Sequence, residues 1–210
     1  MKLYTYPGAP NPRRVHVYLA EKGLELPLQH VDILKRENRS PEFLEKVNPL
    51  GGVPVLELDD GSHLAESVAI CRYLEALHPA PPLFGRTPAE QGRVEMWIRR
   101  LELYFMVPVG MVWIHGSPLT ARVVRQQIPA VAEQNRGLVA RTFELLDREL
   151  AGHEFFAGHD YSMADIVGLT TFDFAADLNG LRPPAGLSHL GRWHAAASGR
   201  PSARAGAGRG

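Results

Sequence analysis

The sequence predicts an α/β N-terminal domain over residues 1–79, followed by an all-α helical domain over residues 89–200. Before residue 79, segments in which apolar residues alternate as in strands are interspersed with segments in which they recur with helical periodicity. After residue 89 the periodicity is almost wholly helical. Between the two, "HPAPPLFGRTP" is rich in proline, which helix and strand interiors both reject. We therefore expect residues 80–88 to be a linker.

In the first half, residues 2–7 alternate as a strand and residues 11–23 form a helix ending at Gly23. "LPLQHVDI" then reads as a second strand. A strand, a helix and a second strand in this order predict a crossover connection between parallel strands.

The rest of this half begins with a short helix at "SPEFLEKV", with Ser40 as its cap and Pro41 as its first residue. "VPVLEL" and "SHL" follow as two strands joined by the turn "DDG", and "ESVAICRYLEALH" forms the last helix. A crossover followed by a hairpin predicts a mixed sheet with helices packed on it.

The second half shows helical periodicity in four segments, in which Pro108 and Pro129 should kink or interrupt the first two. The tail over residues 201–210 is rich in glycine, alanine and arginine, so we expect it to be flexible or weakly docked. The four expected helical segments are residues 89–115, 120–150, 162–178 and 187–197.

Composition limits the kind of protein. Hydrophobic residues make up 45% of the 210 residues, enough for a packed core, and the 23 basic and 23 acidic side chains balance. We therefore expect neither a nucleic-acid surface nor an acidic partner. Cys71 is the single cysteine, which excludes an internal disulfide. With no leader pattern and no long apolar run, we expect a cytoplasmic protein with no membrane association.

The stretch "PGAPNPRRV" joins the first strand to the first helix and presents Asn11 at the helix start. A helix N-terminus has unpaired N–H groups and the positive end of the macrodipole, so it favours an anion, and a thiolate is one candidate. In the alternative interpretation, Asn11 only caps its own helix.

Two further stretches carry possible ligand contacts. Pro54 in "NPLGGVPVLE" leaves neighbouring backbone groups, such as those of Val53, able to meet a peptide ligand in strand fashion. Glu66 and Ser67 in "LAESVAI" start a helix, where Ser67 could take a carboxylate and Glu66 an ammonium group. A strand-entry turn and simple helix capping are the alternatives.

In this order and spacing, these features resemble the cytosolic glutathione S-transferases over roughly residues 2–200. "FFAGHDYSMADI" resembles the family's Gly-x-x-Ser/Thr-x-Ala-Asp element, in which Ser162 and Asp165 fit a capping box that serves folding. The resemblance implies the glutathione transferase architecture, a thioredoxin-like domain plus a helical domain. It also implies glutathione as co-substrate.

The sequence departs from that family where a serine or cysteine commonly stands beside the glutathione sulfur. Those positions fall on Ala9 and Pro10, which have no side-chain donor. "APN" resembles the turn of the Nu-class bacterial transferases, which implies Asn11 as the residue that contacts the sulfur. Tyr6 is the second catalytic candidate because the tyrosine classes use a phenol at the end of this strand. It could equally pack under the sheet.

The expected glutathione-binding residues are Val53, Pro54, Glu66, Ser67, Arg39 and Gly52. Gly52 stands where the family often carries a long polar side chain toward the glycine end of glutathione. Arg39 is expected to substitute, with Asn38 and Lys35 as the other available side chains in that loop.

We expect an electrophile pocket lined by bulky side chains, which could alternatively be interhelical core: Ala9, Tyr104, Phe105, Met111 and Trp113. The nine histidines form no metal-binding spacing, so no metal is expected. The resemblance implies a homodimer, to which Arg72, Glu75 and Arg93 could contribute; a solvated face is the alternative for these residues.

The function that the resemblance implies is detoxification by transfer of the glutathione thiolate to a small, apolar electrophile. Two alternatives stay open. One is a glutathione-dependent disulfide reductase that uses bound glutathione and no protein cysteine. The other is a non-catalytic relative that kept the fold as a binding or interaction module, an interpretation favoured by Ala9 and Gly52.

Overall fold

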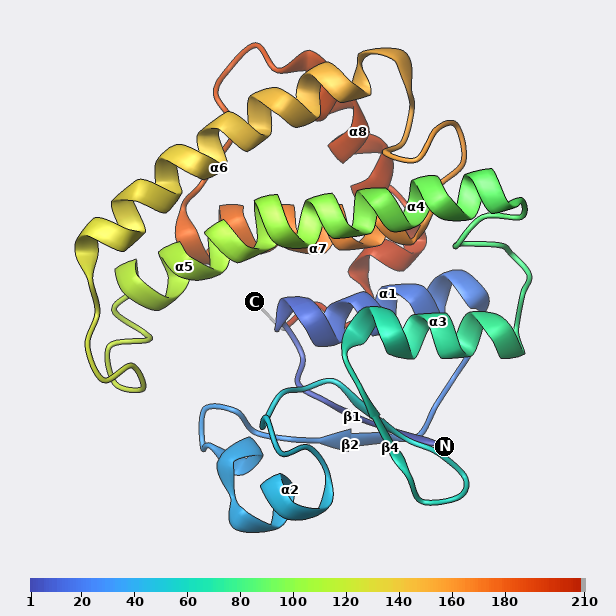
Figure 1. Cartoon of the computed structure of the whole chain (residues 1–210), viewed down its shortest axis with the longest axis vertical. Helices are drawn as coiled ribbons and strands as arrows, with labels where there is room; N and C mark the ends of the chain where they lie inside the picture. Colours follow the sequence, from blue (N-terminus) through green and yellow to red (C-terminus); the bar gives the residue numbers. More distant parts are fainter. Residues whose placement is uncertain (209–210) are drawn as a thin grey trace. The chain divides into compact units, whose positions relative to one another are not determined.

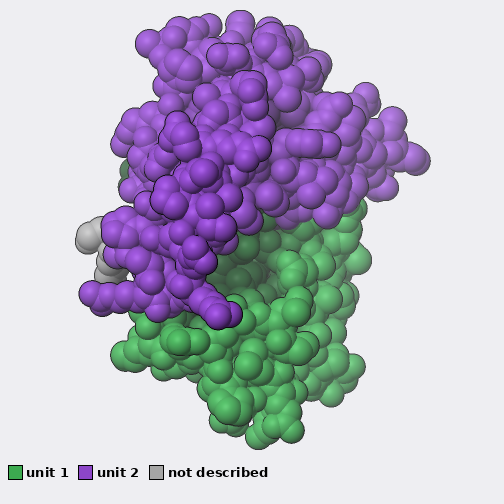
Figure 2. All heavy atoms as spheres, turned by 60° about the vertical axis from the view of Figure 1, so that its left-hand side comes forward, with its two compact units in different colours: residues 1–83, 201–210 green, residues 84–200 purple. Residues whose placement is uncertain are grey.

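A computed structural model describes residues 1–208 of the chain. The chain divides into two compact units, one of Met1–Leu83 together with the residues from Pro201 onward, and one of Phe84–Arg200. Figure 2 colours the two units separately. The boundary at Leu83 falls inside the proline-rich segment that the sequence suggests as a linker.

The first unit is built on a four-stranded mixed sheet with the strand order β2-β1-β3-β4. Strands β1 and β2 run parallel, with Thr5 opposite His30, and the other neighbouring pairs are antiparallel. The predicted crossover and hairpin are therefore confirmed. The elements are β1 (Lys2–Thr5), α1 (Pro10–Lys22), β2 (Leu28–His30), η1 (Glu37–Arg39), α2 (Pro41–Lys46), β3 (Val55–Glu57), β4 (His63–Ala65) and α3 (Ser67–Leu77).

Helices α1 and α3 lie side by side on one face of this sheet, and α2 lies on the other side (Figure 1). Under α2, Phe43 packs with Val31 and Val55. Between the sheet and the two long helices, Leu3, Tyr18 and other apolar side chains are fully buried. This core fixes the N-termini of α1 and α3, where the sequence places the candidate site.

The second unit is helical, as predicted, and contains α4 (Pro88–Leu101), η2 (Glu102–Met106), α5 (Val107–Gly116), α6 (Pro129–Glu149), η3 (Leu150–Gly152), α7 (Met163–Asn179) and α8 (Ser188–Ser198). The second predicted segment, residues 120–150, is interrupted at Pro129 as expected, because α6 begins there, but helix is wrong for residues 120–128. Residues 117–128 instead form turns, in which Gln127 Nε2 donates to the carbonyl oxygens of Ile114 and Ser117 and so covers the end of α5.

Pro108 interrupts the first long helix of this unit, as predicted. It has no N–H for the carbonyl oxygen of Tyr104, and η2, a π-helical turn, precedes it. Thr142 Oγ1 on α6 lies 2.9 Å from that carbonyl oxygen and 2.9 Å from the carbonyl oxygen of Leu138, so its one hydrogen is shared between the two acceptors. The hydrogen bond satisfies an acceptor that the proline leaves open and ties η2 to α6.

The predicted capping box begins α7 and is confirmed. Asp165 is fully buried, and its carboxylate accepts four hydrogen bonds, from Phe156 N, Ser162 N, Ser162 Oγ and Trp193 Nε1, over 2.9–3.0 Å. These bonds tie the start of α7 to the preceding turn and to α8. Asp165 is therefore a folding residue, as the sequence predicts.

Residues 201–208 belong to the first unit, and their first turn is η4 (Pro201–Arg204). They lie against α1, and Ser202 and Ala203 are buried. The last two residues of the expected flexible tail, 209–210, lie outside the described residues.

Candidate functional site

The N-terminus of α1 offers one backbone donor. Ala9 is the N-cap, and the first three helical residues are Pro10, Asn11 and Pro12. Prolines carry no N–H, and the N–H of Arg13 donates to the carbonyl oxygen of Ala9 over 3.0 Å. The N–H of Asn11 is thus the only one that this helix start can direct at a ligand. A bound anion there would meet a single oriented donor together with the positive end of the helix dipole.

The side chain of Asn11 is not used in capping. The N-cap position belongs to Ala9, which makes no side-chain capping bond, and Asn11 stands one residue inside the helix. Its Oδ1 atom is buried and has no hydrogen-bond partner among the described residues. A carboxamide carries both donors and an acceptor, so this side chain has hydrogen-bonding capacity to offer a ligand.

These groups suffice, by magnitude, to ionise a thiol. Lowering a thiol pKa by about two units takes about 2.7 kcal/mol of preference for the thiolate. A helix N-terminus contributes about 0.3–2 kcal/mol, and a hydrogen bond to a charged group about 1.5–3 kcal/mol. The helix start at Asn11 can therefore do the work for which other sites use a hydroxyl.

Tyr6, the second candidate, follows β1, and its ring lies 5.5 Å from that of His30, centroid to centroid. Its hydroxyl has no partner among the described residues. Tyr4, on the same face, donates its hydroxyl to Glu57 Oε2 over 2.8 Å and is thereby committed to the sheet. Of the two tyrosines, only Tyr6 keeps a free hydroxyl.

The N-terminus of α3 is the second helix start in this unit. Ser67 is its first residue and is 5% exposed, with its Oγ 3.5 Å from Nη1 of the buried Arg14 on α1. Glu66 precedes it at φ 70°, a backbone conformation that residues other than glycine rarely adopt. The negative carboxylate of the exposed Glu66 therefore lies next to the positive end of the α3 helix dipole at Ser67.

The site residues expected from the sequence do not include Arg14, which lies on α1. It is 2% exposed and reaches Ser67 across the contact between α1 and α3. The signal was available in the helical pattern, because Arg14 shares a face with the buried Tyr18, one turn further along α1. A buried guanidinium there adds positive charge beside the start of α3.

The turn before β3 contains Val53 and Pro54, joined by a cis peptide bond. Two side chains of the preceding loop hold this turn. Asn38 Nδ2 donates to the carbonyl oxygen of Gly51 over 2.7 Å, and Arg39 Nη1 to that of Leu50 over 3.0 Å.

The three side chains expected to substitute for a long side chain at Gly52 have different partners in the structure. Asn38 is engaged by the backbone, and Lys35 pairs with Asp32 over 3.3 Å. The exposed guanidinium of Arg39 uses one of its five donors on Leu50 and has the others available at the turn.

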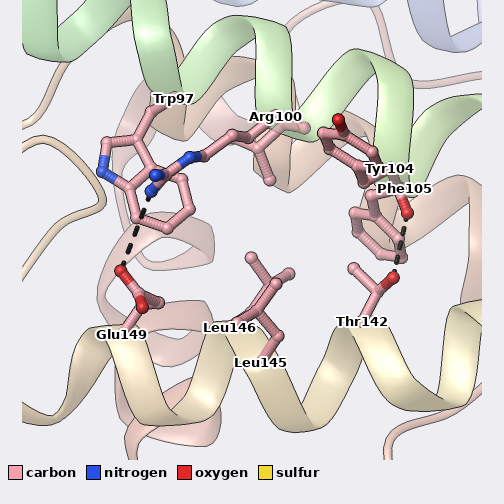
Figure 3. Close-up of a pocket in the computed structure, with 9 residues that line it drawn as sticks. Trp97, Arg100, Tyr104, Phe105, Thr142, Leu145, Leu146 and Glu149 are labelled. Atoms are coloured by element: carbon pink, nitrogen blue, oxygen red, sulfur yellow. Dashed lines mark hydrogen bonds and ion pairs between the residues drawn. The ribbon is translucent and has the colours of Figure 1, made fainter.

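In the second unit, a pocket of about 280 Å³ lies between α4 with η2 on one side and α6 on the other. Figure 3 shows Tyr104 and Thr142 at one end and Arg100 with Glu149 at the other. Arg100 Nη1 lies 3.8 Å from Glu149 Oε2. The lining residues are Trp97, Arg100, Leu101, Tyr104, Phe105, Thr142, Leu145, Leu146 and Glu149.

The structure separates the expected electrophile-pocket residues. Tyr104 and Phe105 line this pocket, Tyr104 being 63% exposed and Phe105 1% exposed. Met111 and Trp113 lie on α5 outside its lining, where the Trp113 ring packs 5.6 Å from that of Phe174. Ala9 belongs to the first unit.

Residues 1–208 contain no group of three or more histidine, cysteine, aspartate or glutamate side chains that could hold a metal ion. Within the same range, no helix combines the length and the apolar character needed to cross a membrane. Cys71 is fully buried on α3, and burial raises the pKa of its thiol.

Comparison with known proteins gives matches along nearly the whole chain. A family model described as "Glutathione S-transferase, N-terminal domain" matches residues 3–82, and one described as "Glutathione S-transferase, C-terminal domain" matches residues 111–201. Glutathione S-transferase 2 of Saccharomyces cerevisiae is 37% identical over 207 residues, covering 97% of this chain and 88% of that protein.

Two solved structures have the same fold throughout. The crystal structure of Gtt2 from Saccharomyces cerevisiae has a TM-score of 0.91 at 36% identity, covering 97% of this chain and 99% of that one. A glutathione S-transferase domain-containing protein from Marinobacter aquaeolei also has a TM-score of 0.91 at 36% identity, covering 96% and 99%.

Proposed function

Because the chain belongs to the glutathione S-transferase family, we propose that it conjugates the thiolate of glutathione to a small, apolar electrophile. The thiol of bound glutathione loses its proton to solvent, and the thiolate forms a carbon–sulfur bond. The electrophile in turn releases a leaving group or, in an activated alkene, takes up a proton at the neighbouring carbon. The protein's part is to ionise the thiol and hold both reactants together.

The α3 start supports a place for the γ-glutamyl end of glutathione. Ser67 Oγ and the N–H groups of the first turn would take the carboxylate, with the charge of the buried Arg14 behind them. The exposed Glu66 would take the ammonium group. The carboxylate and the ammonium group of the γ-glutamyl end would thus each meet a group of opposite charge at the start of α3.

The turn before β3 supports a place for the rest of the tripeptide. The backbone of Val53, next to Pro54, would pair with the cysteinyl residue in strand fashion. Past Gly52, the guanidinium of Arg39 would meet the glycyl carboxylate, since it retains donors beyond the one given to Leu50.

The observation that carries the proposal is the helix start at Asn11. Two prolines leave this residue with the single available N–H, and its carboxamide is not consumed by capping. We assign Asn11, with Tyr6 as the second candidate, to contact with the sulfur. With this assignment, Asn11 makes the sulfur contact that a hydroxyl or thiol would make if one were present at Ala9.

The electrophile class is inferred from side-chain chemistry. Of the residues expected from the sequence, Tyr104 and Phe105 line the pocket between α4, η2 and α6, and the mostly apolar lining of that pocket favours an apolar ligand. The proposal also includes a cytoplasmic homodimer and a role in detoxification, both suggested by the family.

The test combines capture on immobilised glutathione with a conjugation assay on an aryl halide and a parallel reduction assay on a small disulfide. We expect retention, conjugation and a bound thiol pKa below that of free glutathione, measured by thiolate absorbance. Asn11→Ala should raise that pKa while the matched variant Asn135→Ala, on α6, leaves it unchanged.

The other outcomes decide between the alternatives. Reduction without conjugation would assign disulfide exchange through bound glutathione, since Cys71 is buried. Retention with neither activity would assign a binding module. A thiol pKa that does not respond to Asn11→Ala would remove Asn11 from the mechanism.

A further inference from the structure

The C-terminal segment Pro201–Gly208 lies along α1 and reaches the turn that precedes this helix. Near its start, Ser202 Oγ donates to the carboxylate of Glu21, in the last turn of α1. The neighbouring carbonyl oxygen of Ala203 accepts a 2.8 Å hydrogen bond from Arg13 Nη2. The segment is thus attached to residues from both ends of the helix.

Further along, Gly206 contacts the turn itself. Its carbonyl oxygen accepts the N–H of Gly8 over 2.9 Å. The two glycines have φ values of 66° and 81°, which glycine adopts without strain. Gly208 continues the contact, because a Cβ atom added to Gly8 would lie 3.3 Å from the Gly208 Cα.

Gly206 also lies directly against His16. A Cβ atom added at Gly206 would come within 2.7 Å of His16 Cβ and Cδ2, closer than such atoms approach. His16 Nε2 in turn shares a 2.8 Å hydrogen bond with Oγ1 of Thr5, the last residue of β1. Gly206 therefore contacts the β1–α1 turn in two ways. It accepts the N–H of Gly8 directly, and it packs against His16, which is hydrogen-bonded to Thr5.

This turn decides where the donors of Asn11 point. Pro10 and Pro12 remove the neighbouring N–H groups, so no second backbone donor can compensate if Asn11 rotates. The direction of the Asn11 N–H follows from the backbone at Ala9 and Pro10, and Gly8 anchors that backbone. The hydrogen bond from Gly8 to Gly206 therefore helps to set the orientation of the Asn11 N–H.

We propose that the segment Ala205–Gly208 is a positioning element for thiol activation, which holds the β1–α1 turn so that Asn11 faces the sulfur of glutathione. This inference rests on the proposed function. Gly206 acts through Gly8 and has no contact with substrate of its own. Glutathione itself is anchored at Ser67 and Arg39, so loss of the segment should change thiol ionisation more than binding.

Two variants test the proposal. The first ends the chain after Arg204, which keeps the contacts of Ser202 and Ala203 and removes those of Gly206. The second is Gly206→Ala, whose Cβ would collide with His16. The matched control is Gly61→Ala, at a glycine with φ 82° and no neighbour within 4 Å of an added Cβ. Gly61→Ala introduces the same kind of backbone strain at a positive φ but has no contact with the β1–α1 turn.

The readout is the pKa of the bound thiol, with the Kd for glutathione measured by calorimetry and the fold checked by circular dichroism. We expect both variants to raise the thiol pKa by about one unit, which lowers the ratio of thiolate to thiol about tenfold at a given pH. The Kd should change less than threefold, and Gly61→Ala should behave as wild type in both measurements.

Three results would overturn the inference. If the wild-type thiol pKa is lowered and truncation leaves it unchanged, the segment has only a packing role and the proposed function stands. If the pKa rises equally in Gly61→Ala, the effect is general destabilisation. If the wild-type chain binds no glutathione or does not lower its thiol pKa, the proposed function fails, and this inference fails with it.

Discussion

Replacing Ser67 by alanine probes the anchor at the start of α3. The change removes Oγ, which we place against the γ-glutamyl carboxylate of glutathione, and keeps the backbone N–H groups of the helix start. Within the protein, Oγ has a long contact of 3.5 Å to Arg14 Nη1. Because this contact is weak, the substitution should hardly affect the free energy of unfolding.

The magnitude follows from the bond that is lost. A hydrogen bond to a charged group contributes about 1.5–3 kcal/mol, and the remaining N–H groups and the nearby guanidinium would offset part of it. A net loss of about 1–2 kcal/mol raises the Kd for glutathione about 5- to 30-fold. The thiol pKa should stay as in wild type, since Ser67 does not contact the sulfur.

Isothermal calorimetry with glutathione measures this effect, with Ser62→Ala as the matched control. Ser62 is exposed in the β3–β4 hairpin and donates its hydroxyl to Asp60. We expect wild-type affinity for Ser62→Ala. A Kd for Ser67→Ala within twofold of wild type would refute the placement of the carboxylate at α3.

Three further changes have defined outcomes. Glu66→Gln should raise the Kd for glutathione about two- to fivefold, since an exposed ion pair is weak, and no change by calorimetry would remove the ammonium contact. Thr142→Val leaves the Tyr104 carbonyl oxygen without its donor and should lower the unfolding free energy by about 1–3 kcal/mol in urea titration; an unchanged midpoint would contradict this. Burial raises the Asp165 pKa from 3.8 to about 6, so the folded state binds a proton that the unfolded state binds only at lower pH. From about pH 7 to about pH 4, the stability of wild type relative to Asp165→Asn should therefore rise by up to roughly 3 kcal/mol, and a flat or opposite difference would contradict this.

The sheet order and most helices followed from the sequence because local pattern and tertiary packing agree there. The alternation around Leu3 and the hairpin at Gly61 needed no long-range information. The interruption expected at Pro129 is present, since α6 begins at this residue, where a proline needs no N–H. That residues 120–128 form turns instead of a helix is not visible in the periodicity.

The candidate site could be predicted only in part. The helix starts at Asn11 and Ser67 were visible as residue types at strand–helix junctions. That Asn11 lies inside the helix, with Ala9 as the cap, depends on backbone angles that an Asn-Pro pair does not fix. The contact of Gly206 with Gly8 joins residues at opposite ends of the chain, and a tail rich in glycine gives no sign of where it docks.

The most direct test of the thiolate site is the distance from the glutathione sulfur to Asn11 in a crystal structure of the complex. We expect the sulfur within hydrogen-bonding distance of the Asn11 backbone nitrogen or its carboxamide. A sulfur held by the Tyr6 hydroxyl, or directed away from the start of α1, would contradict it.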